Sequence, residues 1–126
     1  MKLLFDTHVV LWLLEDPHAL GTRTRDAVTH AAELAFSVVS FAEIGVKLSI
    51  GKLDVPDDLH ARVLEIGVRI LGLSPEHGLA LGGLPLHHRD PFDRLLVAQA
   101  REDGFTLVTV DREIRAYDVA VLDPRT

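Results

Sequence analysis

The 126-residue chain contains no cysteine, which excludes disulfides, thiolate zinc sites, iron–sulfur clusters and a cysteine nucleophile. It also lacks a membrane segment, because the apolar run Val9–Leu14 is far shorter than the roughly 20 residues that a span needs. We therefore expect a cytoplasmic protein. An excess of positive charge is missing too: 19 acidic and 13 basic residues give a net charge of −6. This balance argues against nucleic-acid binding through a generally basic surface, while a local basic rim stays open.

Hydrophobic residues make up 48% and charged residues 25% of the chain, as in an ordinary globular protein. A length of 126 residues, with no repeats or linkers, predicts a single domain over residues 1–126. Common nucleotide, hydrolase and zinc-protease motifs are absent. The segment Gly45–Lys52 resembles a phosphate-binding loop, but its spacing is one residue too long and Leu53 replaces the hydroxyl residue.

Short apolar runs that alternate with helical segments predict an α/β fold with a mostly parallel, five-stranded sheet covered on both faces. The expected strands are Leu3–Phe5, Phe36–Val39, Val68–Leu73, Phe105–Val110 and Val119–Leu122. The expected helices are Val9–Leu14, Ser40–Ile50, Asp57–Gly67, a short one from Pro75, and one from Asp90 to Gly104. In the helix from Asp57 to Gly67 we expect four apolar residues to face inward: Leu59, Val63, Leu64 and Ile66.

Four acidic residues follow these strands or begin the helices after them: Asp6, Glu43, Asp93 and Asp111. Because the carboxyl ends of parallel strands share one edge, we expect these carboxylates to converge there. Clustered carboxylates repel one another unless a cation neutralises them, and a hard divalent ion, Mg²⁺ or Mn²⁺, suits an all-oxygen site.

Each acid also has a purely structural interpretation. Ser40 with Glu43 matches a capping box, Asp90 before Pro91 suits a helix N-cap, and Asp111 suits another. Glu43 and Lys47 are spaced as a routine surface ion pair. The adjacent histidines at positions 87 and 88 lie in a proline-rich polar turn and are interpreted as a solvated pair outside the site.

Four segments together resemble the PIN-domain family, and in particular its VapC-type toxins. They are Leu4–His8; Ser40–Ile44 with Lys47 and Gly51–Leu53; His88–Ala100; and Leu107–Asp111. The resemblance runs from Leu4 to Leu122, and the segment from His88 to Ala100 is the most specific part.

The resemblance implies a Rossmann-like α/β/α sandwich and a metal-dependent endoribonuclease that is a homodimer and is blocked by a cognate VapB-type antitoxin. The acidic quartet of the family falls on Asp6, Glu43, Asp93 and Asp111. Asp90 is assigned to the N-cap, and Thr7 and Thr109 to holding metal-bound water or orienting a carboxylate.

Basic residues near the acids are candidates for contact with RNA phosphates: Arg94, Lys47 and Arg112 first, then Arg89, Lys52 and Arg115. The main alternative function is a non-catalytic interaction or RNA-binding domain, in which the same acids only cap helices and Trp12 belongs to the core or to an interface. A phosphotransfer receiver domain is disfavoured, because no lysine follows the last strand.

Overall fold

A computed structural model describes residues 1–126, and its centre is a five-stranded sheet in which all neighbouring strands run parallel. The strand order is β3-β2-β1-β4-β5. The strands are β1 (Lys2–Phe5), β2 (Glu33–Ser37), β3 (Arg69–Leu71), β4 (Thr106–Val108) and β5 (Val121–Leu122). The predicted parallel sheet of five strands is confirmed, and its last three strands are shorter than the apolar runs that predicted them.

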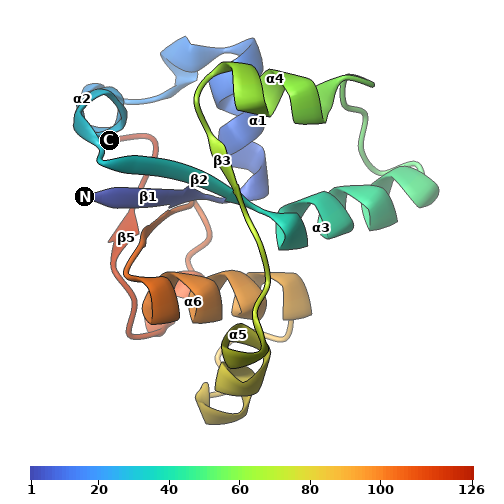
Figure 1. Cartoon of the computed structure of the whole chain (residues 1–126), viewed down its shortest axis with the longest axis vertical. Helices are drawn as coiled ribbons and strands as arrows, with labels where there is room; N and C mark the ends of the chain where they lie inside the picture. The colour runs from blue at the N-terminus through green and yellow to red at the C-terminus, as the bar shows by residue number, and fades with distance from the viewer.

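Helices cover both faces of this sheet, so the predicted three-layer α/β/α sandwich is confirmed. They are α1 (Thr7–Glu15), α2 (Thr22–His30), α3 (Val38–Ser49), α4 (Leu59–Glu65), α5 (Pro75–Ala80) and α6 (Pro91–Asp103). Three short 3₁₀ turns, η1 (Pro17–Ala19), η2 (Leu81–Gly83) and η3 (Ile114–Ala116), complete the chain. Helices α1, α2 and α4 lie on one side of the sheet and α5 and α6 on the other (Figure 1). None of these helices is long and apolar enough to cross a bilayer.

Two separate hydrophobic cores explain why the strands are continuously apolar rather than alternating. In β1, Leu3 and Phe5 belong to the core beneath α1 and α4, whereas Leu4 belongs to the core beneath α6. In β4, Leu107 and Val108 divide between the two cores in the same way. Both faces of a covered parallel sheet are dry, so consecutive buried positions of β1 and β4 are apolar.

The structure corrects the predicted start of α3. Ser37, not Ser40, is the N-cap: its backbone is extended and its hydroxyl accepts a hydrogen bond from the N–H of Val39 at 3.0 Å. The helix therefore begins at Val38, and Glu43 lies in its second turn rather than in a capping box. The start of α6 follows the prediction, because Asp90 accepts hydrogen bonds from the N–H groups of Phe92 and Asp93.

The inward face predicted for the third helix is half right. Leu59 and Val63 are buried, but Leu64 and Ile66 are exposed. Residues four apart lie on one stripe of a helix, and the seven residues of α4 press only that stripe onto the sheet. Leu64 is turned away from this stripe, and Ile66 lies beyond the last helical residue.

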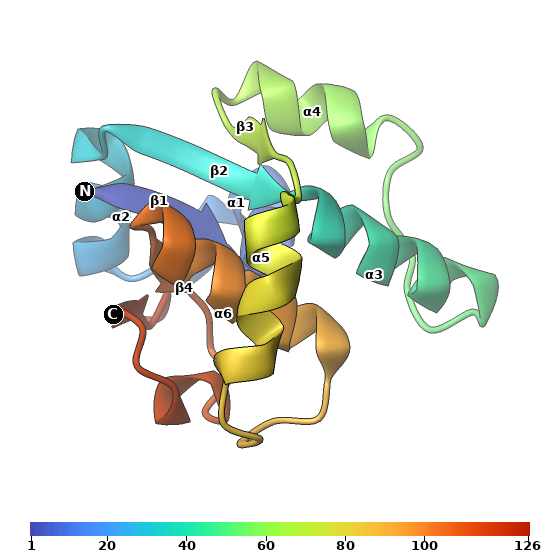
Figure 2. The ribbon, with the colours of Figure 1, turned by 60° about the horizontal axis from the view of Figure 1, so that its bottom comes forward.

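The order of the strands creates a reversal point between β1 and β4. The chain builds outward from β1 through β2 to β3, then returns through α6 to place β4 on the opposite side of β1. Figure 2 shows α3 extending away from this edge of the sheet and the chain entering α6 next to it. In open parallel sheets a crevice forms at such a reversal, outside the carboxyl ends of the strands.

Candidate metal centre

A polar cleft of about 320 Å³ opens at the carboxyl end of β1 and β4. Its lining contains one apolar residue and eight polar ones: Val110, and Asp6, His8, Glu43, Lys47, His88, Asp90, Asp93 and Asp111. The four acids singled out in the sequence therefore lie around one cleft, although they are up to 105 positions apart in the chain, from Asp6 to Asp111.

Asp6 directly follows β1 and is held in place on both of its carboxylate oxygens. Oδ1 accepts a hydrogen bond from the N–H of Thr7 at 2.7 Å, and Oδ2 accepts one from the Thr109 hydroxyl at 2.7 Å. The backbone N–H of Asp6 donates to the carbonyl of Val108 in β4. These contacts fix the carboxylate at the reversal point, where only 8% of the residue is exposed.

Glu43 reaches the cleft from α3 and is tied to α1 through a side chain. The Thr7 hydroxyl donates to its Oε1 at 2.7 Å, and the ammonium of Lys47 lies 3.2 Å from its Oε2. Glu43 is only 6% exposed, so this ion pair belongs to the cleft and is not the surface pair that the spacing suggested. Thr7 and Thr109 thus each orient one carboxylate.

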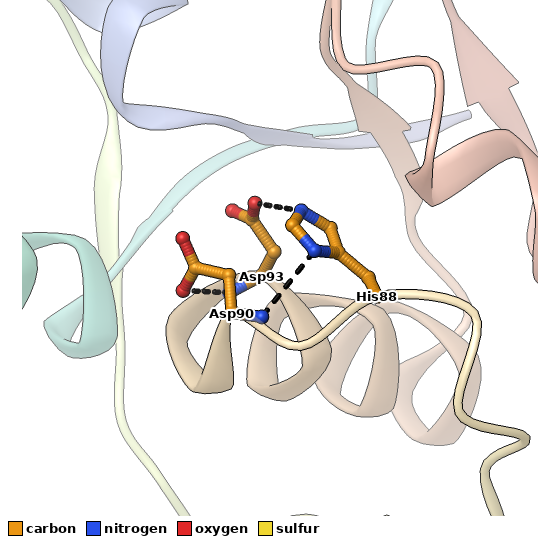
Figure 3. Close-up of side chains that lie close together, drawn as sticks. All are labelled: His88, Asp90 and Asp93. Carbon is orange, nitrogen blue, oxygen red and sulfur yellow. Dashed lines mark hydrogen bonds and ion pairs between the residues drawn. The ribbon is translucent and has the colours of Figure 1, made fainter.

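Asp93 lies in the first turn of α6, beside the N-cap Asp90. Only one oxygen of Asp90 is used in capping, because Oδ1 accepts both backbone hydrogen bonds. The ligand atoms of Asp90, Asp93 and His88 lie within 4.8 Å of one another and form a potential metal-binding group (Figure 3). The positive end of the α6 dipole favours negative charge at this place.

Asp111 comes from the loop after β4 and has its backbone anchored at the same point. Its N–H donates to the hydroxyl of Thr109 at 3.1 Å, and its Oδ1 accepts from the N–H of Glu113 at 2.8 Å. Thr109 therefore links the two acidic loops, since it also donates to Asp6. Oδ2 of Asp111 remains directed at the cleft, where it meets His88.

The sequence interpretation of His88 as a solvated residue is wrong. Its Nε2 lies 2.8 Å from Oδ2 of Asp93 and 3.2 Å from Oδ2 of Asp111, and its side chain is 15% exposed. His87, the other member of the pair, is exposed and packs against the ring of Tyr117. The sequence did contain a signal for the role of His88: it stands two residues before Asp90, the N-cap of α6, in the loop that leads to the acidic edge of the sheet.

Because these groups lie close together, the pKa values of several of them are shifted. Burial, the charges of Asp6 and Asp90 and the contact with Asp111 raise the pKa of Asp93 to about 8. Burial also raises the pKa of Asp6, although hydrogen bonds from Thr109 and Thr7 oppose that shift. The cleft therefore cannot hold all of its carboxylates ionised at neutral pH without added positive charge.

Asp111 and His88 both contact Asp93, and the pKa of each shifts in the direction opposite to the effect of burial. Burial disfavours the charged form of Asp111, but hydrogen bonds from the Glu113 backbone, Asp93 and His88 outweigh it and hold the pKa of Asp111 below its usual range. Burial would lower the pKa of His88, yet the surrounding carboxylates of Asp111, Asp93 and Glu113 raise it. These carboxylates thus favour the protonated form of the imidazole.

The predicted RNA-contacting residues divide between the cleft and other places. Lys47 lines the cleft, and Arg112 is exposed beside Asp111. Arg94 lies elsewhere: its guanidinium donates to the carbonyl groups of Leu81 and Leu84, and so holds the turn before α6. Arg94 is half-buried on α6, and its contact with RNA phosphate stays a prediction.

The donor set of the cleft fits a hard divalent cation. Carboxylates of Asp6, Glu43, Asp93 and Asp111 line it, and Mg²⁺ and Mn²⁺ prefer oxygen ligands of this kind. The raised pKa of Asp93 shows the electrostatic need for a cation at this point. An ion here would favour the ionised form of that carboxyl, so its binding would release a proton.

Replacing Asp93 by asparagine should stabilise the metal-free protein in a pH-dependent way. A carboxyl whose pKa rises on folding contributes stability that is complete below its unfolded pKa, near 4, and is lost as the pH rises through about 8. We therefore expect Asp93→Asn to raise Tm at pH 8 by about 4 °C or more, the effect of roughly 1 kcal/mol in a chain of this size, and by less at pH 5. Thermal unfolding in a chelator, with the exposed Asp118→Asn as the charge-matched control, measures this; equal shifts at both pH values would contradict it.

Comparison with known proteins assigns the chain to a family. A model of the PIN domain matches residues 3–120. Ribonuclease VapC22 of Mycobacterium tuberculosis is 33% identical over 117 residues, which cover 90% of each protein. Two solved structures share the fold. VapBC2 from Rickettsia felis, bound to a promoter DNA fragment, gives a TM-score of 0.72 at 14% identity over 97% of this chain and 98% of that one. VapBC-1 from nontypeable Haemophilus influenzae gives 0.69 at 18% identity over the whole of both chains. The chain belongs to the PIN-domain family, and within that family to the VapC type.

Proposed function

We propose that this chain is a Mg²⁺- or Mn²⁺-dependent endoribonuclease and the toxin component of a toxin–antitoxin pair. The observation that carries the proposal is the convergence of Asp6, Glu43, Asp93 and Asp111 on one polar cleft at the strand reversal. The 33% identity to a protein named as a ribonuclease supports RNA as the substrate. The reaction is hydrolysis of a phosphodiester bond.

The carboxylates divide the work of holding the ion and the water. Asp6 and Asp93 would be the principal ligands, Asp111 would bind the ion directly or through water, and Glu43 would either bind it or position the attacking water. A bound divalent cation supplies the positive charge that makes water more acidic and offsets the negative charge developing on the phosphate. Thr109 and Thr7 keep Asp6 and Glu43 oriented through their 2.7 Å hydrogen bonds.

RNA has to approach a chain whose net charge is −6. Lys47 is the basic side chain that lines the cleft, and its position beside Glu43 suits contact with the phosphate next to the bond that is cut. Arg112 lies exposed at the rim beside Asp111 and is a second phosphate contact in this proposal. In this proposal the local positive charge of these two residues attracts the RNA phosphates, since the protein has no generally basic surface to do so.

A VapB-type antitoxin is the proposed partner of this chain. The solved structures that share its fold include VapBC2 of Rickettsia felis and VapBC-1 of Haemophilus influenzae, which supports such a partner. We infer that the antitoxin covers the acidic cleft and that the chain forms a homodimer. We also propose that the chain acts in the cytoplasm.

The purified protein should cleave RNA in Mg²⁺ or Mn²⁺, and Asp93→Asn should reduce the rate by at least about 100-fold, because the ligand charge is lost with little change in shape. Total bacterial RNA is incubated with each protein and resolved on a gel, with a chelator lane and with Asp118→Asn as the matched control. Equal cutting by Asp93→Asn and the wild type would contradict the proposal. RNA binding without cutting, by protein shown to be folded, would favour the alternative of a non-catalytic RNA-binding domain.

Lys47→Ala should weaken RNA binding and reduce the salt dependence of that binding by about one phosphate contact. Binding is measured by fluorescence anisotropy at several salt concentrations, in the Asp93→Asn background so that the RNA stays intact. Arg101→Ala, near the far end of α6, is the control and should leave both quantities unchanged. An unchanged salt slope in Lys47→Ala would exclude this phosphate contact.

Expression of the chain alone should slow the growth of a bacterial host, and Asp93→Asn should not, if toxicity requires RNA cleavage. Addition of the cognate antitoxin should restore growth and stop cleavage by the purified complex. Growth curves and RNA gels from the same cultures measure the two effects. If the Asp93→Asn culture is inhibited to the same extent at equal protein level, toxicity does not depend on the acidic cleft. That result would refute this part of the proposal.

A further inference from the structure

One nitrogen donor is aimed at the carboxylates of the cleft, and none of the roles proposed above uses it. His88 lies in the loop before α6. Figure 3 shows its ring turned toward Asp93, with Asp90 on the other side of Asp93. Its Nε2 is 2.8 Å from Oδ2 of Asp93 and 3.2 Å from Oδ2 of Asp111. The ring therefore bridges two of the carboxylates assigned to the metal.

These distances match the spacing of neighbouring ligands around one metal ion. Ligands at right angles in an octahedral shell lie about 3 Å apart, because each is roughly 2.1 Å from the ion. Nε2 of His88 stands at such a distance from one oxygen of Asp93 and one of Asp111. His88 would therefore be placed to bind an ion held by these carboxylates, and its ligand atom already lies within 4.8 Å of those of Asp90 and Asp93.

The far side of the ring is supported as in many metal-binding histidines. Nδ1 lies 2.9 Å from Oε2 of Glu113, and a carboxylate that accepts the Nδ1 proton leaves Nε2 free to bind a metal. In the other tautomer Nε2 carries the proton and donates to Asp93. Nδ1 then accepts a hydrogen bond from the Asp90 N–H at 3.3 Å. The loop thus accommodates the ring both with and without an ion.

The backbone of His88 is fixed as well. Its N–H donates to the hydroxyl of Tyr117 at 3.0 Å, and Tyr117 itself is buried in the core beneath α6. The imidazole is therefore anchored at its backbone and at its distal nitrogen. A ligand that is held in place before the ion arrives loses little conformational freedom on binding.

We propose that His88 is a nitrogen ligand of the divalent cation and that it makes this site prefer Mn²⁺ over Mg²⁺. Imidazole binds first-row transition ions well, whereas Mg²⁺ strongly prefers oxygen. This inference rests on the proposed function, since it uses the carboxylates assigned there to the ion. It adds a residue and a metal preference to the acidic quartet.

Calorimetric titration of the whole protein with Mn²⁺ and with Mg²⁺ tests the preference. His88→Ala should weaken Mn²⁺ binding by about tenfold or more and change Mg²⁺ binding by less than about threefold. The exposed neighbour His87→Ala is the matched control and should behave as the wild type. An equal loss for both ions would show a structural role alone, and tighter binding of both would show that the ring only occupies the place of the ion; either result overturns the proposal.

A spectroscopic measurement tests the bond itself. Pulsed electron paramagnetic resonance of the Mn²⁺-loaded wild type should show coupling to an imidazole nitrogen, which persists in His87→Ala and disappears in His88→Ala. Glu113→Gln, a change at an exposed side chain, keeps the protein folded and should weaken Mn²⁺ binding by up to about tenfold through His88. Mn²⁺ bound without nitrogen coupling overturns the role of His88 while leaving the proposed function intact. A wild type that binds neither ion overturns both.

Discussion

The repulsion among buried carboxylates is the constraint on which the functional part of this structure depends. Asp6, Glu43 and Asp93 are each less than a tenth exposed and lie around one cleft with Asp111. Such a group is unstable unless positive charge compensates for it, and burial together with the neighbouring carboxylates accordingly raises the pKa of Asp93 to about 8. Within the protein the compensation comes from His88, Lys47 and the start of α6, and a divalent cation would complete it.

The parallel sheet supplies the geometry that makes this crowding possible. The strands bring Asp6 and Asp111 to the same edge, and the reversal between β1 and β4 leaves room for the cleft there. The two helices that follow or precede the central strands add Glu43 and Asp93. The sheet is buried on both faces by two cores, and this packing supports the edge from which the carboxylates extend.

Small polar residues convert that rigid edge into an ordered site. Thr109 contacts both Asp6 and the backbone of Asp111, so a single hydroxyl sets the relation between the ends of β1 and β4. Asp90 caps α6 with one oxygen, and its carboxylate also lines the cleft beside Asp93. The same side chain can therefore begin a helix and belong to a charged site, which is why capping and function could not be separated by inspection of the sequence.

The sequence by itself determined the parallel α/β sandwich and the gathering of the four acids at one edge, because alternating strands and helices place the ends of the strands together. It also determined the N-cap Asp90 and the end of α6 at Gly104, because capping chemistry is local. Only the tertiary structure decided which side chains meet across the cleft. It placed the ring of His88 between Asp93 and Asp111, and it placed the guanidinium of Arg94 against backbone carbonyl groups. Contacts between side chains depend on the exact path of loops that are distant in sequence, and local propensity does not encode that path.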